Sequence, residues 1–333
     1  MKKFLFTIIL LLALSLLGFF RYLSLVQNPV DENNTTDISF QIKKGQTVKE
    51  IAKNLDEKQL IKSNLAFSIY AKLHKLDKNI LAGRFILKKS MNTPQILATL
   101  SDPQKAQTVI TVQEGLRIKD IDSKLAELEL IETGEFTNEV KKFNGWEYYT
   151  FLNKDVLEKL ELPLEGYLYP DTYFLDPNDF QPHDLIFLML DNFEKKTAEF
   201  LPQIKRHTIH EIITIASIIE NEVFGEEDRK IVSGILWKRL ESGWKLDADA
   251  TLLYISDDRK ISGKELESSS PYNTRKLGGL PPGPISNPSL ESIEASMFPE
   301  ESQYWFYLTT SDTGEVIYAR SNEEHNENRA KYL

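Results

Sequence analysis

The residues best suited to chemistry are two glutamates, Glu220 and Glu222, which end an almost wholly apolar segment. Thr208 and Glu211 form a capping-box pattern, which predicts that a helix begins there. That helix would bury side chains at helical spacing: Ile212, Ile213, Ile215, Ala216 and Ile219. A carboxyl at the end of such a helix is expected to be partly desolvated, and so able to hold a proton as a general acid does. The commoner alternative is a solvated final turn with both carboxylates pointing outward.

Other chemistries lack their motifs. Five histidines without an HExxH pattern, and no cysteine, predict no metal site. No phosphate-binding loop and no GxSxG sequence is present, and an SxxK match at residues 242–245 lacks its partner motif. Carboxylate chemistry on a sugar polymer remains. Glycosidases ordinarily use two carboxylates, and Glu222, Asp247 and Asp249 are candidates for the second. One acid suffices if a hydroxyl of the substrate itself attacks the anomeric carbon.

The elements that must position Glu220 flank it in the sequence. The pattern predicts helices over residues 183–201 and 228–241, and a strand pair over 304–309 and 316–320. Residues 268–290 contain five prolines and three glycines around tyrosine, asparagine and leucine. A loop of this length and composition indicates docking on its domain rather than a free linker.

The N-terminus has the pattern of a membrane anchor. Lys2 and Lys3 precede an uncharged run from Phe4 to Phe20, which Arg21 ends. Seventeen helical residues span about 25 Å, which is just enough to cross the core of a bilayer. No small-residue cleavage site follows, so we expect an uncleaved single-pass anchor with the lysines in the cytoplasm and the rest outside; a cleaved signal peptide is the alternative. The net charge of −10 argues against a nucleic-acid surface.

An internal repeat follows at an offset of seventy residues. Residues 42–55 align with residues 112–125, and both copies read as a strand, a glycine turn at Gly45 or Gly115, and an amphipathic helix. The first copy resembles the LysM module, which binds glycans containing N-acetylglucosamine. A generic strand–helix packing unit without a ligand is the alternative.

Motifs along nearly the whole chain resemble the YceG-like endolytic murein transglycosylases. They are EGYLYPDTY at 165–173, ASIIENE at 216–222, Arg229, RL at 239–240, DAT at 249–251, SPYNT at 270–274 and GLPPGPISNP at 279–288. The sequence departs from the family pattern at Ala250, where the family usually has proline, and at Lys238, where it often has asparagine. The first departure affects the rigidity of a turn, and the second removes an amide.

The resemblance implies cleavage of the bond between N-acetylmuramic acid and N-acetylglucosamine in nascent peptidoglycan, leaving a 1,6-anhydro end. Glu220 matches the family's catalytic glutamate, which acts first as acid and then as base, without metal or organic cofactor. The residues that we expect to bind substrate or to orient Glu220 are Glu165, Tyr167, Tyr173, Ser217, Glu222, Arg239, Asp249, Thr251, Tyr254, Tyr272, Asn273, Pro282 and Asn287.

These expectations combine into an α+β protein of the plasma (inner) membrane. Residues 1–25 would form the cytoplasmic tip and anchor, 26–37 a tether, 38–104 the LysM-like module and 105–333 the catalytic domain, with its core at 206–333. The expected partners are peptidoglycan strands, the membrane and candidate cell-wall synthases. Two alternatives stay open: a non-catalytic peptidoglycan-binding scaffold, and a muramidase that uses water and a second carboxylate such as Asp249.

Overall fold

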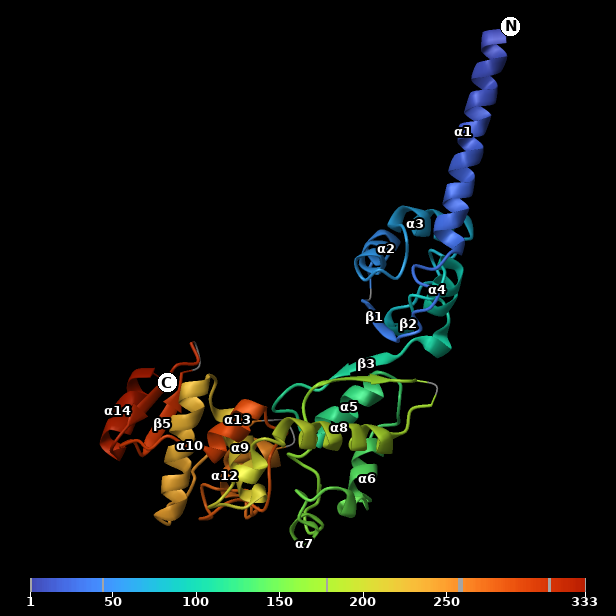
Figure 1. Ribbon diagram of the computed structural model, residues 1–333. Helices are drawn as coiled ribbons and strands as arrows, with labels where there is room; N and C mark the ends of the chain where they lie inside the picture. Colours follow the sequence, from blue (N-terminus) through green and yellow to red (C-terminus); the bar gives the residue numbers. More distant parts are fainter. Residues whose placement is uncertain (1, 44, 178, 257–259, 311–312, 333) are drawn as a thin grey trace. The chain divides into compact units, whose positions relative to one another are not determined.

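The computed structural model describes residues 2–43, 45–177, 179–256, 260–310 and 313–332, and it divides the chain into two compact units. Unit 1 comprises residues 1–110 and 174–180, and unit 2 comprises residues 111–173 and 181–333. The class is mixed α+β, as the sequence predicts. Figure 1 shows the order of the elements along the chain.

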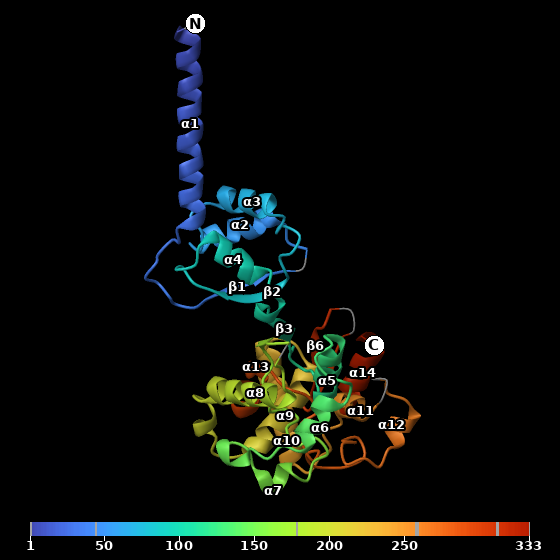
Figure 2. The ribbon, with the colours of Figure 1, turned by 90° about the vertical axis from the view of Figure 1, so that its right-hand side faces the viewer.

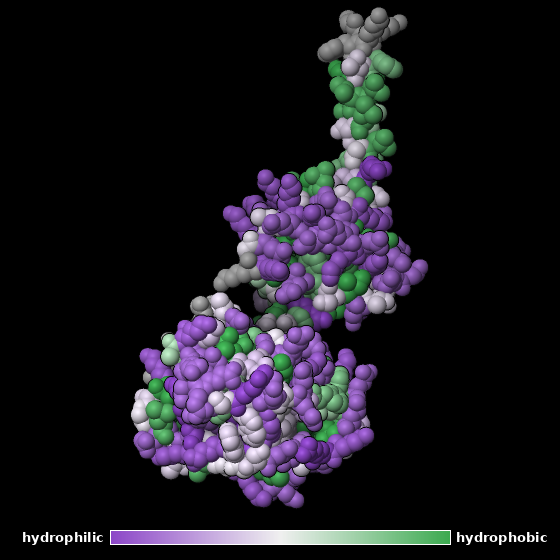
Figure 3. Space-filling view, turned by 90° about the vertical axis from the view of Figure 1, so that its left-hand side faces the viewer, coloured by the Kyte–Doolittle hydropathy of each residue, from purple (hydrophilic) through white to green (hydrophobic). Residues whose placement is uncertain are grey.

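Helix α1 (Lys2–Gln27) opens unit 1. Its segment Phe6–Gln27 is long and apolar enough to cross a membrane, so the predicted N-terminal apolar helix is confirmed. The space-filling view in Figure 3 shows this helix as an exposed hydrophobic rod. The helix extends two residues beyond the expected anchor because Val26 is fully buried against the rest of unit 1. The segment that follows is also attached: Asp31 N donates to Lys89 O at 3.1 Å.

The body of unit 1 is a two-stranded antiparallel sheet covered by three helices. Ile38 pairs with Leu87 and Ile42 with Gly83, so every second side chain of the sheet enters the core. A capping box between Thr47 and Glu50 starts the first of these helices. The elements are β1 (Ile38–Ile42), α2 (Val48–Glu57), α3 (Asn64–Leu73), β2 (Gly83–Leu87) and α4 (Thr93–Leu100).

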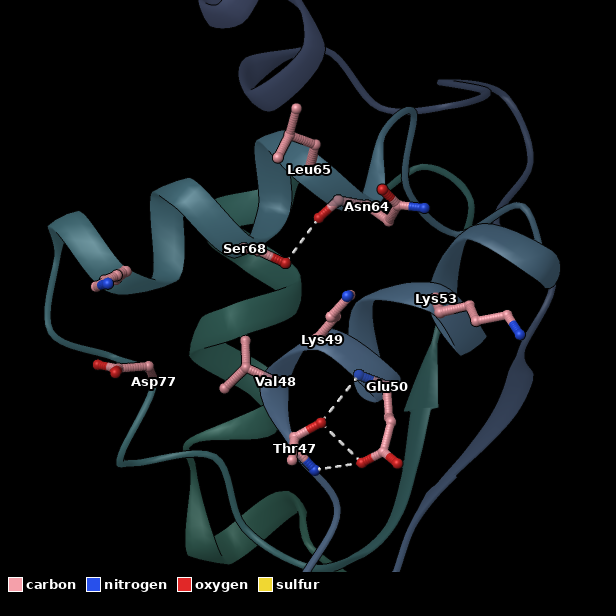
Figure 4. Close-up of a pocket in the computed structure, with 10 residues that line it drawn as sticks. Thr47, Val48, Lys49, Glu50, Lys53, Asn64, Leu65, Ser68 and Asp77 are labelled. Carbon is pink, nitrogen blue, oxygen red and sulfur yellow. Dashed lines mark hydrogen bonds between the residues drawn. The ribbon is translucent and has the colours of Figure 1, made fainter.

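An open groove of about 740 Å³ lies between α2 and α3. Figure 4 shows four of the residues that line this groove: Val48 and Lys49 on α2, and Asn64 and Leu65 on α3. It therefore offers apolar surface together with amide, hydroxyl and ammonium groups.

The same order of elements recurs seventy residues later. Strand β3 (Thr108–Thr111) is followed by α5 (Ile118–Glu127) and α6 (Glu135–Lys141), and β3 pairs with β4 (Thr172–Leu175). Gly45 and Gly115 both adopt positive φ, +86° and +76°, which turns the chain from strand to helix where a side chain would be strained. In the second copy, a longer segment with α7 (Lys154–Leu157) separates the second helix from the returning strand.

The core of unit 2 is helical. Helices α9, α10 and α13 pack against one another, and they lie side by side in Figures 1 and 2. The two helices predicted over residues 183–201 and 228–241 are present, with shifts at their ends. The strand pair predicted over 304–309 and 316–320 is also present and slightly shorter. The elements are α8 (Pro182–Thr197), α9 (Ile209–Glu222), α10 (Glu226–Glu241), α11 (Asp249–Ile255), α12 (Gly263–Glu267), α13 (Leu290–Met297), β5 (Phe306–Thr309), β6 (Val316–Ala319) and α14 (Asn322–Tyr332).

The proline- and glycine-rich segment is docked within unit 2, as its composition indicates. Asn273 and Asn287 are completely buried, and Thr274 and Ser286 are 1% exposed. Asn287 joins three stretches of chain: its Oδ1 accepts from Gly166 N and Leu168 N, both at 3.1 Å, and its Nδ2 donates to Leu116 O at 2.9 Å. This loop is therefore part of the core that supports α9.

Candidate active site

Helix α9 holds Glu220 in its last turn. The predicted capping box is present, because Thr208 Oγ1 accepts from Glu211 N at 3.2 Å and Thr208 N donates to Glu211 Oε2 at 2.7 Å. Every residue of the segment 212–219 is buried. With its middle enclosed, the helix reaches the surface only at its two ends, and Glu220 is on the final turn.

The carboxylate of Glu220 is surrounded by hydrogen-bond donors. Arg229 Nη2 lies 3.2 Å from Oε1. Oε2 accepts from the backbone N of Ser289 at 2.9 Å, from the Ser289 hydroxyl, and from the Ser292 hydroxyl at 2.8 Å. The Glu220 side chain is only 7% exposed. A guanidinium and three donors surround this carboxylate, so its environment is more than the simple desolvated end that the sequence indicates.

A glycine turn lies beside the side chain of Glu220. A Cβ atom added to Gly115 would lie 3.8 Å from Glu220 Cγ and 3.7 Å from Asn221 Oδ1. Gly115 N donates to Asn287 O at 2.9 Å, which attaches the turn to the buried loop. Asn221 in turn donates to Ser286 Oγ at 2.7 Å. The second copy of the repeat thus contributes backbone to the surroundings of Glu220.

Glu222 belongs to a separate pocket of about 310 Å³, which Asp249 and Arg239 also line. Ala250 N donates to its Oε1 at 3.0 Å, and the hydroxyl of Tyr307 approaches its Oε2 at 3.4 Å. Burial raises the pKa of Glu222 to about 7, with the nearby Asp249 charge acting in the same direction. Glu222 is therefore poised to titrate near neutral pH.

The residues expected to orient Glu220 make other contacts. Asp249 pairs with Arg275, whose Nε lies 2.8 Å from Oδ1. Arg239 donates to the carbonyl oxygens of Trp305 and Leu246. Thr251 donates to Ala248 O at 2.8 Å. Among the contacts of the described residues, none of these three side chains reaches Glu220. Asp249 and Arg239 line the pocket of Glu222 instead.

A third group of predicted residues surrounds a pocket of about 520 Å³: Glu165, Tyr254, Tyr272 and Pro282. The rings of Tyr254 and Tyr272 lie 4.8 Å apart. Glu165 is 1% exposed and its Oε1 accepts from Ile118 N at 3.0 Å, at the start of α5. Burial raises the pKa of Glu165 to about 8, against the opposing effects of that hydrogen bond and of Arg117.

The remaining predicted residues hold the fold together. Tyr167 OH lies 3.2 Å from His210 Nδ1, and Tyr173 OH donates to Tyr169 O at 2.5 Å. Ser217 Oγ donates to Thr214 O and accepts from Ile285 N, while Asn273 donates to three carbonyls of the preceding loop. These side chains have hydrogen-bond partners inside the protein.

The sequence interpretation missed the partners of Glu220. In the sequence, Arg229 belongs only to the set of motifs that resemble the family, and Ser289 and Ser292 lie outside those motifs. A usable signal exists for the serines: Ser289 follows the Asn287-Pro288 pair and is the N-cap of α13, with Ser292 one helical turn later. Within the described residues there is no group of three or more histidine, cysteine, aspartate or glutamate side chains that could hold a metal ion.

The fold and site define a two-unit α+β protein with an N-terminal apolar helix and a glutamate-centred polar cluster at the end of a buried helix. The YceG-like family model matches residues 40–331. The chain belongs to the YceG-like family.

Similar proteins cover most of the chain. The endolytic murein transglycosylase of Bacillus subtilis (strain 168) is 31% identical over 331 residues, which is 95% of this chain and 90% of that protein. The endolytic murein transglycosylase of Streptococcus pneumoniae (strain D39) is 30% identical over all of this chain, which corresponds to 65% of its own length. The crystal structure of a yceG-like protein from Listeria monocytogenes superimposes with a TM-score of 0.62 at 31% identity, covering 88% of this chain and 99% of that one.

Proposed function

We propose that this chain is an endolytic murein transglycosylase that cleaves peptidoglycan strands with Glu220 as its general acid and base. Membership of the YceG-like family and the relatives of that name support the reaction class. The observation that carries the assignment of Glu220 is its enclosure by Arg229, Ser289 and Ser292 at the end of a buried helix. Glu220 is also the glutamate of the ASIIENE motif.

In the proposed reaction Glu220 gives its proton to the glycosidic oxygen between N-acetylmuramic acid and N-acetylglucosamine as the C1–O4 bond breaks. The resulting carboxylate accepts the proton of the muramoyl 6-hydroxyl while O6 bonds to C1. The proton count balances, no water is consumed, and the new end is a 1,6-anhydro sugar. The alternative hydrolysis would use water and a second carboxylate, for which Asp249 is the candidate.

The partners of Glu220 suit both of its protonation states. Arg229 and the Ser289 backbone N–H stabilise the carboxylate that is left after proton donation. A serine hydroxyl either donates or accepts, so Ser289 and Ser292 can rotate to accept from a protonated Glu220 before the reaction. Burial strengthens each of these interactions because little water competes for them.

Substrate contacts are assigned to the surfaces around Glu220. The Gly115 turn lies beside the side chains of Glu220 and Asn221, and the pockets at Glu222 and at Tyr272 provide polar and aromatic walls. Tyr167, Tyr173, Ser217, Asn273 and Asn287 act by holding those walls in place. In this assignment residues 105–333 are the catalytic domain, with the core at 206–333.

The chain is assigned to the plasma (inner) membrane, with α1 as a single-pass anchor, its N-terminus in the cytoplasm and the remainder outside. The apolar helix and the lysines that precede it support this topology. Residues 38–104 act as a LysM-like glycan-binding module. The strand–helix–helix–strand order of β1, α2, α3 and β2 and the groove between the two helices support that role.

The test is Glu220→Gln, which keeps size and shape but cannot donate or accept the proton. It should abolish cleavage of purified glycan strands while the circular dichroism spectrum and sacculus binding stay unchanged. Glu226→Gln, at an exposed surface ion pair, is the matched control and should cleave normally. Cleavage by Glu220→Gln would refute the mechanism. Mass spectrometry of the new ends separates the alternatives, since a hydrolysed end is one water heavier than an anhydro end.

A further inference from the structure

Helix α3 carries an apolar stripe that nothing in the described part of the chain covers. Leu65, Ile69 and Leu73 lie at i, i+4 and i+8, on one face of the helix, and are 66%, 41% and 69% exposed. The opposite face of α3 is already used, because Phe67 and Ala71 are fully buried in the core of unit 1. An aligned exposed apolar stripe is the usual mark of an interaction surface.

This stripe lies next to the end of α1. Helix α3 packs against α1 within unit 1, and α1 also contacts α4. The last turn of α1 is held to this body: Val26 is fully buried, and Asn92 Nδ2 donates to Gln27 O at 3.3 Å. Figures 1 and 2 show α3 on the side of the body from which α1 leaves. In Figure 3 hydrophobic surface continues from α1 onto this side.

The charges of the segment 62–78, which contains α3, are mainly positive although the whole chain is acidic. The segment 62–78 contains a single acidic residue, Asp77, against four lysines, and the net charge of the chain is −10. All four lysines are exposed: Lys62, Lys72, Lys75 and Lys78. Apolar side chains flanked by lysines match the two layers of a membrane surface, in which acyl chains lie beneath anionic headgroups.

We propose that the Leu65–Ile69–Leu73 face of α3 lies in the interfacial layer of the bilayer that α1 spans, with its lysines among anionic phospholipid headgroups. The proposal rests on the proposed role of α1 as a membrane anchor. The continuity of the stripe with α1 selects a lipid surface as the occupant. Through this second contact, unit 1 is held flat against the membrane rather than free to swing on the end of α1.

The chain has no cysteine, which allows an unambiguous labelling experiment. The variants Leu65→Cys, Ile69→Cys and Leu73→Cys, each in the full-length chain, are labelled with an environment-sensitive fluorophore and reconstituted into phosphatidylcholine–phosphatidylglycerol vesicles. Lipids that carry a nitroxide at a shallow acyl position should quench all three labels at least threefold more than a label at Lys53→Cys. Lys53 is the control because it lies on α2 with its side chain 71% exposed.

The outcomes separate this proposal from the anchor itself. A chain that floats with the vesicles but shows no more quenching at the three positions than at Lys53→Cys overturns the α3 contact and leaves the anchor intact. A chain that does not float refutes the anchor and the α3 contact together. Energy transfer between labels on different chains, without lipid quenching, would identify the occupant as a second copy and also overturn the proposal.

Discussion

At the scale of single residues, the chemistry depends on how a buried charge is stabilised. Glu220 is nearly as inaccessible as a core residue, yet its carboxylate has a cation and three donors around it. Glu222, two residues away, has one backbone donor and a distant hydroxyl, and its pKa is raised to about 7. The two neighbouring glutamates therefore have different surroundings, because the tertiary structure brings different groups to each carboxylate.

Removing the cation should change both stability and activity. Arg229→Met leaves Glu220 without its ion-pair partner at a site where the two side chains are 14% and 7% exposed. We expect the free energy of unfolding to fall by roughly 3 kcal/mol, as for other broken buried pairs. Cleavage should also slow, because the cation that stabilises the carboxylate left after proton donation is gone. Denaturant titration and kcat/KM measure the two effects.

Arg206→Met is the control for that variant. Arg206 pairs with Glu241 at 2.7 Å, but their side chains are 73% and 43% exposed. Solvent screens such a pair, so the free energy of unfolding should change by less than about 1 kcal/mol and kcat/KM should stay unchanged. An Arg229→Met enzyme with a wild-type kcat/KM would show that Arg229 has no electrostatic role at Glu220.

The raised pKa of Glu165 predicts that the stability of the protein depends on pH. Its pKa rises from 4.5 to about 8 on folding, mainly through burial, so the folded state binds the proton more tightly than the unfolded state does. The stability from this group is complete below pH 4.5 and is lost as the pH rises through 8. Glu165→Gln keeps an acceptor for Ile118 N and cannot ionise.

Relative to this variant, wild type should lose roughly 1 kcal/mol of unfolding free energy per pH unit across the upper part of that range. Urea unfolding at a series of pH values measures the difference. Glu161→Gln, whose side chain is 75% exposed at the same pocket, should follow wild type. Parallel curves for wild type and Glu165→Gln would contradict the raised pKa.

At the scale of elements, the site depends on segments that cross at close range. Asn287 ties the turn after β3 and the loop before β4 to the proline-rich segment, and that segment carries Ser289 to Glu220. Gly166 lies at this crossing with φ +87°, and an added Cβ would come within 2.4 Å of Pro284 Cβ. The approach of these backbones is thus possible only without a side chain at position 166.

Gly166→Ala should therefore destabilise unit 2 strongly, by about 3 kcal/mol or more, through both strain in φ and overlap with a rigid ring. Gly243→Ala is the matched control, since Gly243 has φ +72° and nothing within 4 Å of the added Cβ. It should cost only about 1 kcal/mol from φ strain. Thermal unfolding followed by circular dichroism measures both. Equal losses would mean that the crossing at Gly166 is not tightly packed.

At the scale of the whole molecule, one supersecondary unit serves two purposes. In unit 1 the strand–helix–helix–strand unit stands by itself around its own core and carries an open groove. In unit 2 the second copy supplies Gly115 beside Glu220, and its α5 begins at the carboxyl of Glu165. The same order of elements therefore occurs in the proposed glycan-binding module and in the proposed catalytic domain, with different surfaces in use.

Cleavage of glycan strands should be separable from attachment to the membrane. A chain that lacks residues 1–27 loses the only apolar helix of membrane-spanning length among the described residues. It should move from the membrane fraction to the soluble fraction and should still cleave soluble glycan strands, because the described hydrogen-bond and ion-pair partners of Glu220 all belong to unit 2. Fractionation and end-group analysis measure the two properties. A truncated chain that folds but cleaves nothing would show that the anchor is required for catalysis.

Much of the fold follows from local sequence signals. Some predicted features depend only on neighbours within a few residues, and all of these are present: the capping box at Thr208, the apolar face of α9, the N-terminal apolar helix and the β5–β6 pair. The position of Glu220 at the end of its helix follows from the same local rules. By contrast, Asp249, Thr251 and Arg239 are expected to orient Glu220 or the substrate, and their contacts among the described residues are with groups other than Glu220. Spacing along the chain does not determine which side chains meet in the folded protein.

The sequence by itself determined the elements, the repeat and the glutamate, since each is encoded in periodicity and capping over short stretches. The tertiary structure decided the environment of that glutamate. Ser289 and Ser292 reach Glu220 from about seventy residues away, and Arg229 reaches it from the next helix. These contacts arise from close packing of α9, α10 and α13 around a buried loop, and packing partners are selected by shape and burial in three dimensions rather than by order in the chain.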